Sequence, residues 1–228
     1  MKIGVIGGSG FIGSEICRQF ESKINKVINI TESGTDEKYF DILINANGNP
    51  YKYLAEQNPV RDFDMAVRTV YESIINYNFN LYVYVSSIDV ESPITCYGCN
   101  RLIAEEIVRV YCQDYLIIRL CSIIGPGMKK GVVKDILEGS PSRLTVDSQL
   151  YLMTVDEVAR KLINIVTDNQ IRNQAVRFYS KAPIDVYNIY KTIDKDCNIS
   201  ENAKYEHYFF PGSHLGFLTS QEYLKQIL

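Results

Sequence analysis

The sequence has few of the residues that build metal and nucleic-acid sites. It contains two histidines, His207 and His214, and one CxxC pair, Cys96 and Cys99, with no second pair to complete a zinc site. Its 24 Lys and Arg do not outnumber its 27 Asp and Glu, and the net charge is −3. A balance of that sign gives no reason to expect nucleic acid or an acidic membrane as a partner. We expect no metal, and we interpret the six cysteines as buried or incidental thiols.

Long hydrophobic runs are also missing. No apolar stretch approaches the roughly 20 residues that span a bilayer. The first ten residues, MKIGVIGGSG, are apolar but interrupted by glycines, and no small-residue cleavage site follows them. They predict a strand and a turn rather than a signal peptide. We therefore expect a cytoplasmic protein whose thiols stay reduced and which does not bind membranes.

Strand-like and helix-like segments alternate through most of the 228 residues. The predicted strands are Lys2–Ile6, Lys26–Thr31, Ile42–Asn45, Leu81–Val85 and Tyr115–Ile123. Apolar residues recur at helical spacing in the segments 12–20, 63–74, 103–111 and 155–166. This alternation predicts an α/β fold of the Rossmann type, with a doubly wound parallel sheet covered on both faces.

The predicted sheet is trimmed between its second and third strands. Only ten residues separate Thr31 from Ile42, whereas a crossover with its helix needs at least about 10–12 residues. A full helix and an extra strand do not fit there. Beyond the predicted Rossmann domain, residues 1–168, we expect a small C-terminal substrate lobe at 169–228. The boundary between them is soft, and a single domain is the alternative.

A glycine-rich turn joins the first predicted strand to the first helix. Its sequence, GGSGFIG, has GxxGxxG spacing. Gly7 allows a tight turn, Gly10 lets the backbone approach a pyrophosphate at the helix N-terminus, and Gly13 lets the helix lie close to the strand. The turn predicts a dinucleotide site, and the alternative is a glycine-rich turn without a ligand. The predicted cofactor-binding residues here are Gly7, Ser9, Gly10, Phe11, Ile12 and Gly13.

A second constellation combines a hydroxyl, a phenol and a cation. Ser87 ends a predicted strand, and Tyr97 and Arg101 follow at i and i+4 spacing, which puts them on one face of a helix. A cation beside a phenol favours the phenolate. The set predicts a proton donor or acceptor for interconversion of a carbonyl and an alcohol. Simple packing with a solvated charge is the alternative.

These segments together resemble a known family. GGSGFIG, the strand ending YVYVSS, and YGCNRLIAEE are similar to the extended branch of the short-chain dehydrogenase/reductase family, and DILINANGN and YLIIRLCSIIGPG agree. The resemblance covers roughly residues 1 to 190. It implies a Rossmann fold, a nicotinamide cofactor and a Ser–Tyr–Lys catalytic set. By position, Ser87 would orient the substrate and Tyr97 would be the acid/base, while Arg101 stands where the family has Lys, which it does not simply replace.

The resemblance also implies further binding residues. Those beside the cofactor are Ala46, Asn47, Gly48, Leu120 and Ser122, together with Tyr97 and Arg101. Those beside the substrate are Ser87, Asp89 and Ser122. Thr31 and Glu32 stand where an acidic residue would bind the adenosine ribose. Glu32 suits NAD, whereas a neutral Thr31 tolerates NADP, so we expect NADP or NAD, with NADP slightly favoured.

The implied function is that of an NAD(P)-dependent oxidoreductase acting on a nucleotide-linked sugar. Ile88 replaces the acid that family dehydratases carry, which disfavours dehydration. The short segment from Met128 to Tyr151 favours 4-keto reduction, with Tyr97 as proton donor, over the alternative of epimerisation. A second alternative is a non-catalytic dinucleotide-binding protein with a lapsed active site. Because family members often dimerise through two helices, we expect a homodimer formed by residues 63–77 and 100–112.

Overall fold

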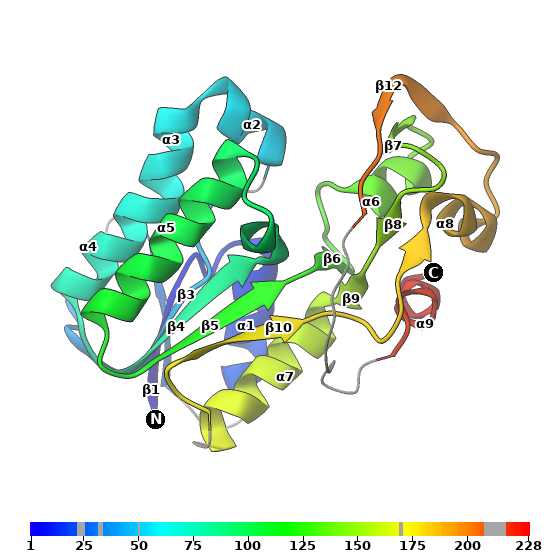
Figure 1. Ribbon diagram of the computed structural model, residues 1–228. Coiled ribbons are helices and arrows are strands. Elements are labelled where there is room, and N and C mark those ends of the chain that lie inside the picture. Colours follow the sequence, from blue (N-terminus) through cyan, green and yellow to red (C-terminus); the bar gives the residue numbers. More distant parts are fainter. Residues whose placement is uncertain (22–25, 32–33, 50, 169–170, 208–217) are drawn as a thin grey trace. The chain divides into compact units, whose positions relative to one another are not determined.

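The computed structural model describes residues 1–21, 26–31, 34–49, 51–168, 171–207 and 218–228. It divides the chain into two units. The first comprises Met1–Leu120 and Ala159–Val176, and the second comprises Cys121–Val158 and Arg177–Leu228. Figure 1 labels the elements of both.

The first unit is built on a six-stranded sheet in the order β10-β5-β4-β3-β1-β2. The strands are β1 Lys2–Ile6, β2 Lys26–Ile30, β3 Tyr39–Asn45, β4 Asn78–Ser87, β5 Tyr115–Leu120 and β10 Gln174–Phe178. β1 pairs in parallel with β2 on one side and with β3 on the other, and Gly4 lies opposite Ile28 and Leu43. The pairs β3–β4 and β4–β5 are also parallel. The carboxyl ends of these strands therefore meet at one edge.

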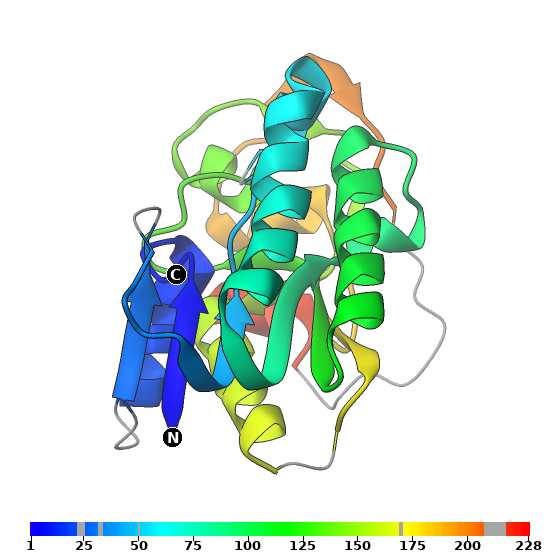
Figure 2. The ribbon, with the colours of Figure 1, turned by 90° about the vertical axis from the view of Figure 1, so that its left-hand side faces the viewer.

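Helices cover both faces of this sheet, as the alternating pattern predicts. α1 (Phe11–Glu21) and α7 (Val155–Asp168) lie on one face. On the other lie α3 (Pro59–Phe63), the π-helical turn η1 (Asp64–Arg68), α4 (Thr69–Asn76) and α5 (Cys96–Tyr111), and α4 and α5 run side by side (Figures 1 and 2). Two short elements, α2 (Lys52–Gln57) and the 3-10 turn η2 (Ile88–Glu91), follow β3 and β4. The predicted α/β Rossmann-type fold is confirmed.

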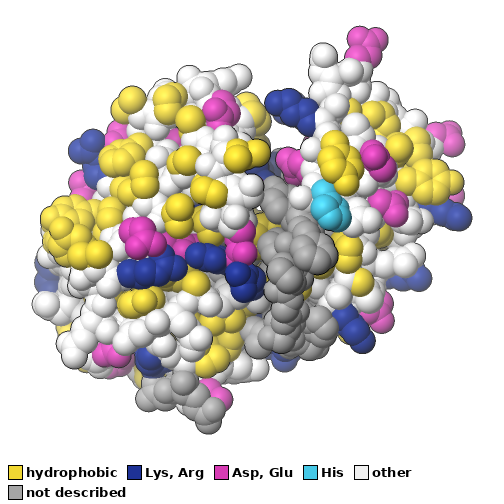
Figure 3. Space-filling view, viewed as in Figure 1, with side chains coloured by type: hydrophobic (Ala, Val, Ile, Leu, Met, Phe, Trp, Pro, Cys, Tyr) yellow, Lys and Arg dark blue, Asp and Glu magenta, His cyan; other side chains and the backbone are white. Residues whose placement is uncertain are grey.

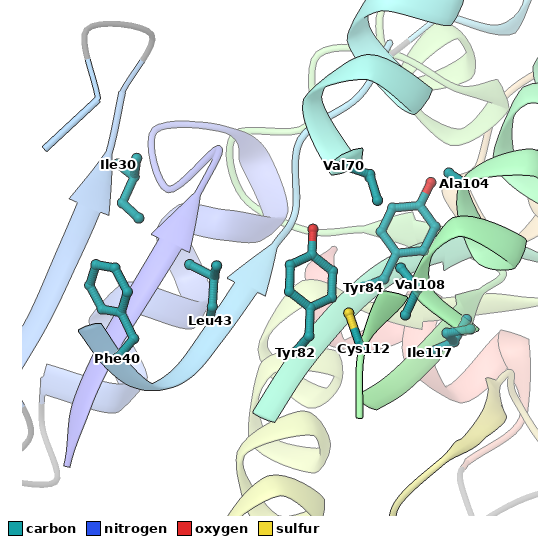
Figure 4. Packing of buried hydrophobic residues seen from close by; sticks show 10 residues of the cluster. All are labelled: Ile30, Phe40, Leu43, Val70, Tyr82, Tyr84, Ala104, Val108, Cys112 and Ile117. Carbon is teal, nitrogen blue, oxygen red and sulfur yellow. The ribbon is translucent and has the colours of Figure 1, made fainter. Parts of the chain in front are cut away.

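Apolar side chains from the sheet, α4 and α5 form a core (Figure 4). Tyr82 and Tyr84 project from β4 into it and are fully buried. The Tyr82 hydroxyl lies 2.6 Å from Ser73 Oγ and accepts a hydrogen bond from Asn45 Nδ2 at 3.1 Å. Buried hydroxyls need such partners, because a buried polar group without one costs about 1–3 kcal/mol. Burial raises the pKa of Tyr82, so the phenol stays neutral.

The expected trimming of the sheet is also present. β2 is an edge strand, and among the residues described between β2 and β3 none is helical. Thr31 instead forms an isolated bridge with Gly34, whose φ of 76° turns the chain sharply. The chain therefore returns to the sheet on the far side of β1, and its described residues there form no helix.

The prediction of one strand from Tyr115 to Ile123 is wrong, because this segment changes partners at Cys121. The Cys121 N–H bonds the Phe178 carbonyl, whereas the Ser122 N–H bonds the Tyr151 carbonyl. β5 ends at Leu120, and β6 (Ser122–Ile124) pairs with β9 (Leu152–Thr154) in the second unit.

In its described residues the second unit consists of short strand pairs and three helices. β7 (Ser142–Leu144) pairs with β12 (Ile199–Lys204), and β8 (Gln149–Leu150) pairs with β11 (Ile184–Asp185). The helices are α6 (Val132–Leu137), α8 (Val186–Ile193) and α9 (Ser220–Ile227). α9 begins with a reciprocal capping box between Thr219 and Glu222. None of the described helices in either unit is long and apolar enough to cross a membrane.

Candidate active site

The glycine turn after β1 has the geometry that its spacing predicts. Gly7 has a φ of 78°, a conformation that other residues rarely adopt. The Gly10 N–H donates to the Gly7 carbonyl at 2.9 Å, which closes the turn just before α1 begins at Phe11. A Cβ on Gly13 would lie 2.8 Å from the carbonyl carbon of Gly7, so only glycine lets the helix pack this closely. Gly10 itself is exposed at the N-terminus of the helix.

The structure brings the predicted loop after β3 beside this turn. The Ala46 N–H donates to the Ile6 carbonyl at 2.9 Å. A Cβ on Gly7 would lie 2.9 Å from the backbone nitrogen of Asn47. Small residues thus lie along the edge where β1 and β3 end, and Ser9 and Gly10 are exposed there. This shape fits the close approach of a dinucleotide diphosphate, which the N-terminus of α1 would favour.

Asn29, in β2, is a neighbour of the turn that was not among the predicted site residues. Its side-chain amide donates to Ser9 Oγ at 2.8 Å, and a Cβ on Gly8 would lie 2.8 Å from its Cγ. Thr31, the predicted ribose-binding position, is exposed beyond it. Glu32 lies outside the described residues. The available signal was the i, i+2 spacing of Asn29 and Thr31, which places both on one face of the strand.

Ser87 and Asp89 lie together where β4 ends. Ser87 caps the turn η2, and its hydroxyl donates to Asp89 Oδ2 at 2.6 Å. Lys52, in α2, places its ammonium 2.7 Å from Asp89 Oδ1. Lys52 was not among the predicted site residues, because 37 positions separate it from Asp89.

Arg101 is buried, and one nitrogen of its guanidinium donates hydrogen bonds to three acceptors in the protein. Its Nη1 donates to the Asn47 carbonyl at 3.3 Å, the Tyr84 hydroxyl at 3.2 Å and the Val85 carbonyl at 3.3 Å. The guanidinium carbon also lies 5.2 Å from the centre of the Tyr97 ring. Arg101 therefore connects the loop after β3, the end of β4 and the predicted acid/base.

Two neighbours, Gly48 and Tyr84, accommodate the guanidinium group of Arg101. Gly48 has a φ of 147°, and a Cβ there would lie 2.6 Å from the guanidinium carbon. Burial raises the pKa of Tyr84, although the positive charge of Arg101 opposes that rise. Tyr84 is thus a neutral phenol that accepts a hydrogen bond from a cation.

Helix α5, which carries Tyr97, is fixed to the sheet by a buried ion cluster. Glu105 Oε1 accepts from Ser86 Oγ at 2.7 Å and from Arg119 Nε at 3.0 Å. Its Oε2 accepts from Arg119 at 2.7 Å and from Arg109 at 2.9 Å. At the N-terminus of the helix, Thr95 Oγ1 accepts from the Gly98 N–H at 3.1 Å. Tyr97 is therefore held one turn above Arg101 on an anchored helix.

Two further predicted residues are Leu120 and Ser122. Leu120 is buried at the end of β5 and pairs with Ser87 of β4, and Ser122 is exposed in β6 of the second unit. Burial raises the pKa of the Cys112 thiol to about 12 and that of Cys17 to about 11, so both stay protonated at neutral pH.

Among the described residues, no group of three or more His, Cys, Asp or Glu side chains is arranged to hold a metal ion.

No protein-family model and no curated protein sequence matches the chain. Solved structures do. MoeE5, determined with UDP-glucose and NAD, is 14% identical with a TM-score of 0.81, covering 100% of this chain and 97% of that one. A dTDP-4-dehydrorhamnose reductase from Clostridium acetobutylicum is 15% identical with a TM-score of 0.78, covering 100% and 98%. UDP-glucose 4-epimerase from Thermotoga maritima is 18% identical with a TM-score of 0.77, covering 100% and 97%. At these identities the likeness establishes the fold, so the chain has the Rossmann-type fold of these nucleotide-sugar enzymes.

Proposed function

We propose that this protein is an NAD(P)-dependent reductase of a nucleotide-linked sugar that bears a keto group. The observation that carries the proposal is the position of Arg101. Its guanidinium contacts the Asn47 loop beside the glycine turn, the end of β4 that bears Ser87, and the ring of Tyr97. Arg101 thereby links the proposed dinucleotide-binding edge to the strand that bears the Ser87 hydroxyl and to the phenol of Tyr97.

The residues divide the chemistry among them. The backbone N–H groups of the turn from Gly7 to Gly13 would hold the diphosphate of NADP or NAD. A reduced nicotinamide, when bound, supplies a hydride to the carbonyl carbon of the sugar. Tyr97 donates its phenolic proton to the carbonyl oxygen, which becomes the hydroxyl. Arg101 stabilises the phenolate that remains, because a cation beside a phenol favours its charged form.

Similar structures support the substrate class. MoeE5 was determined with UDP-glucose and NAD, and the dehydrorhamnose reductase acts on a dTDP-linked sugar. The short segment between Met128 and Tyr151 favours a reductase, because an epimerase must retain its keto intermediate while the sugar turns. We also propose that the second unit, and within it Ser122, contributes to sugar binding.

One observation favours a second candidate function. Arg101, which stands where the family has Lys, directs its Nη1 to three acceptors within the protein. A residue so engaged suits a non-catalytic dinucleotide-binding protein as well as an enzyme.

A deuterium-transfer experiment distinguishes these candidates. Nucleotide-linked 4-keto-6-deoxy sugars are incubated with 4-deuterated NADPH or NADH and analysed by mass spectrometry. The proposal predicts deuterium in the sugar and stoichiometric oxidation of the cofactor. Interconversion of two hydroxy sugars without net cofactor change would identify an epimerase. Cofactor binding without any turnover would identify a non-catalytic protein.

We further propose that the protein forms a homodimer through α4 and α5. Large apolar side chains are exposed along these helices and α3 (Figure 3), among them Ile75 (58%) and Val110 (74%). A groove of about 580 Å³ beside them is lined partly by Val60, Phe63 and Ile94. Exposed apolar side chains on neighbouring helices are common at protein interfaces. Sedimentation of the wild type and of Ile75→Glu tests the proposal, because only the wild type should sediment as a dimer.

A further inference from the structure

Two cysteines lie on either side of the proposed acid/base in the first turn of α5. Cys96 and Cys99 form the single CxxC of the sequence, and Tyr97 stands between them. Neither is buried, because Cys99 is exposed and Cys96 is half-buried. Both also line the groove of about 580 Å³, so a small oxidant can reach both thiols. The proposed reduction gives this pair no role.

The geometry of the helix places the two thiols within reach of one another. α5 is regular from its first turn, where the Cys99 N–H donates to the Thr95 carbonyl at 2.9 Å. In such a turn the Cα atoms of residues i and i+3 lie about 5 Å apart. A disulfide accepts Cα separations of about 4.4–6.8 Å, so the pair can close without unfolding the helix. A CxxC in an α/β protein is a recurrent form of redox-active thiol pair.

Closure of the pair would move the residue between them. The Cβ atoms of residues i and i+3 lie about 5–6 Å apart in a helix, whereas a disulfide holds them at about 3.5–4.5 Å. The turn has little room for this change, because a Cβ on Gly98 would lie 2.9 Å from the Asp89 carbonyl oxygen. The Cys96 N–H also donates to Glu56 Oε1 at 2.7 Å. With both neighbours held, the displacement falls on Tyr97.

We propose that Cys96 and Cys99 are a redox modification site, and that the disulfide between them switches off Tyr97. The effect on turnover rests on the proposed function, whereas formation of the disulfide does not. Misplacement of a catalytic group by about 1 Å can lower a rate about 100-fold. The oxidised form should therefore turn over more slowly than the reduced form.

The oxidation is balanced with a peroxide as the oxidant. Cys99 is the exposed thiol, and a hydrogen bond to Glu56 raises the pKa of the Cys96 thiol, so Cys99 attacks first. The Cys99 thiol, which donates to the Pro93 carbonyl at 3.0 Å, gives up its proton and attacks one peroxide oxygen. The O–O bond breaks, and the departing hydroxide takes that proton as water. The Cys96 thiol then attacks the sulfenic sulfur, which forms the S–S bond and releases a second water.

Labelling with N-ethylmaleimide, before and after hydrogen peroxide treatment of the full chain, tests the disulfide. Trypsin releases both cysteines in one peptide, residues 69–101, that contains no other cysteine. In the reduced protein this peptide should carry two labels. After peroxide it should carry none and be lighter than the unlabelled peptide by two hydrogen atoms, and dithiothreitol should restore both labels. A non-reducing gel should show no link between chains.

Turnover of nucleotide-linked 4-keto-6-deoxy sugars by the same samples tests the switch. The wild type should lose about 10- to 100-fold in turnover on oxidation and regain it with dithiothreitol. Cys99→Ser lacks the attacking thiol and should keep its rate after peroxide. Cys197→Ser is the matched control, because it removes an exposed cysteine of the second unit, and it should respond as the wild type does.

The outcomes separate the disulfide, the switch and the proposed function. Persistent labelling of both thiols, or a disulfide between chains, overturns the modification site. A disulfide in Ile75→Glu alone overturns it for the native protein, since the proposed dimer would then shield the pair. A disulfide that leaves turnover unchanged overturns the switch and leaves the proposed function standing. Absence of turnover in the reduced wild type overturns the proposed function and the switch together, while the peptide masses still decide whether the disulfide forms.

Discussion

Gly10 and Gly13 lie three residues apart, and their substitutions are predicted to have different effects. Substitution of Gly13 should lower stability, and substitution of Gly10 should abolish cofactor binding. Gly13 is a packing residue. In Gly13→Ala the Cβ would collide with the Gly7 carbonyl oxygen and lie 2.8 Å from the carbonyl carbon, whereas ordinary contacts begin near 3.4 Å. The helix or the turn must therefore move to relieve both contacts. The Gly7 carbonyl accepts the Gly10 N–H, so movement there also strains that hydrogen bond.

The cost of Gly13→Ala can be worked out from these contacts. Overpacking costs about 1–3 kcal/mol and a weakened hydrogen bond about 1 kcal/mol, while replacing glycine by alanine in a helix returns about 1 kcal/mol. The net loss is about 2 kcal/mol. For a chain of this size that lowers the melting temperature by about 4–8 °C.

Gly10→Val should behave differently. Gly10 is exposed, and a Cβ there meets just one atom within 4 Å, the Gly7 oxygen at 3.1 Å. Its melting temperature should fall by less than that of Gly13→Ala, yet NADH and NADPH should no longer bind, because the side chain occupies the approach of the diphosphate. Differential scanning calorimetry and binding titrations measure both quantities. The reasoning is refuted if Gly13→Ala melts like the wild type, or if Gly10→Val binds either cofactor normally.

Three further predictions concern catalysis, the ion cluster and pH. Tyr97→Phe should lower turnover by about 10²–10⁴-fold with cofactor binding retained, and Arg101→Lys should keep turnover; wild-type rates in Tyr97→Phe would disprove the assignment. Glu105→Gln should lower the free energy of unfolding by about 3 kcal/mol, near the lower end for a broken buried pair, because Arg119 keeps Glu91 and Arg109 keeps Glu106; denaturant unfolding measures it. The hydrogen bond from Lys2 holds the pKa of Glu37 below its ordinary value of 4.5, so its stabilisation is present above that value and is lost as the pH falls through the lower folded pKa. Melting curves between pH 3 and 7 should therefore show less acid sensitivity in Lys2→Met than in the wild type.

The parts of the fold that were predicted correctly depend on residues that lie close together in the sequence. The strand, the glycine turn and α1 follow within 21 residues, and each has its own periodicity or spacing. The trimmed sheet followed from chain length alone, because ten residues between Thr31 and Ile42 cannot hold a helix and a strand. Such features need no knowledge of distant partners.

The parts that were missed depend on residues far apart in the chain. The break between β5 and β6 cannot be recognised in the apolar sequence of this segment. It arises because the hydrogen-bond partner of the backbone changes from Phe178 to Tyr151. The contacts of Asn29 with Ser9 and of Lys52 with Asp89 span 20 and 37 residues. Polar side chains in strands and short helices are ordinarily solvated, so nothing local distinguishes these two from their neighbours.

Arg101 shows why a family position and its chemistry must be weighed separately. The resemblance predicts a lysine whose ammonium is a compact charge on a flexible stem, whereas the planar guanidinium presents five donors in fixed directions. Here Nη1 alone reaches two carbonyls and a phenol from three segments, and Gly48 lacks the Cβ that would collide with the group. Arg101 thus holds the loop after β3 against the end of β4 while its charge lies over Tyr97. Arginine at this position therefore keeps a positive charge over the Tyr97 ring and links two segments of the protein.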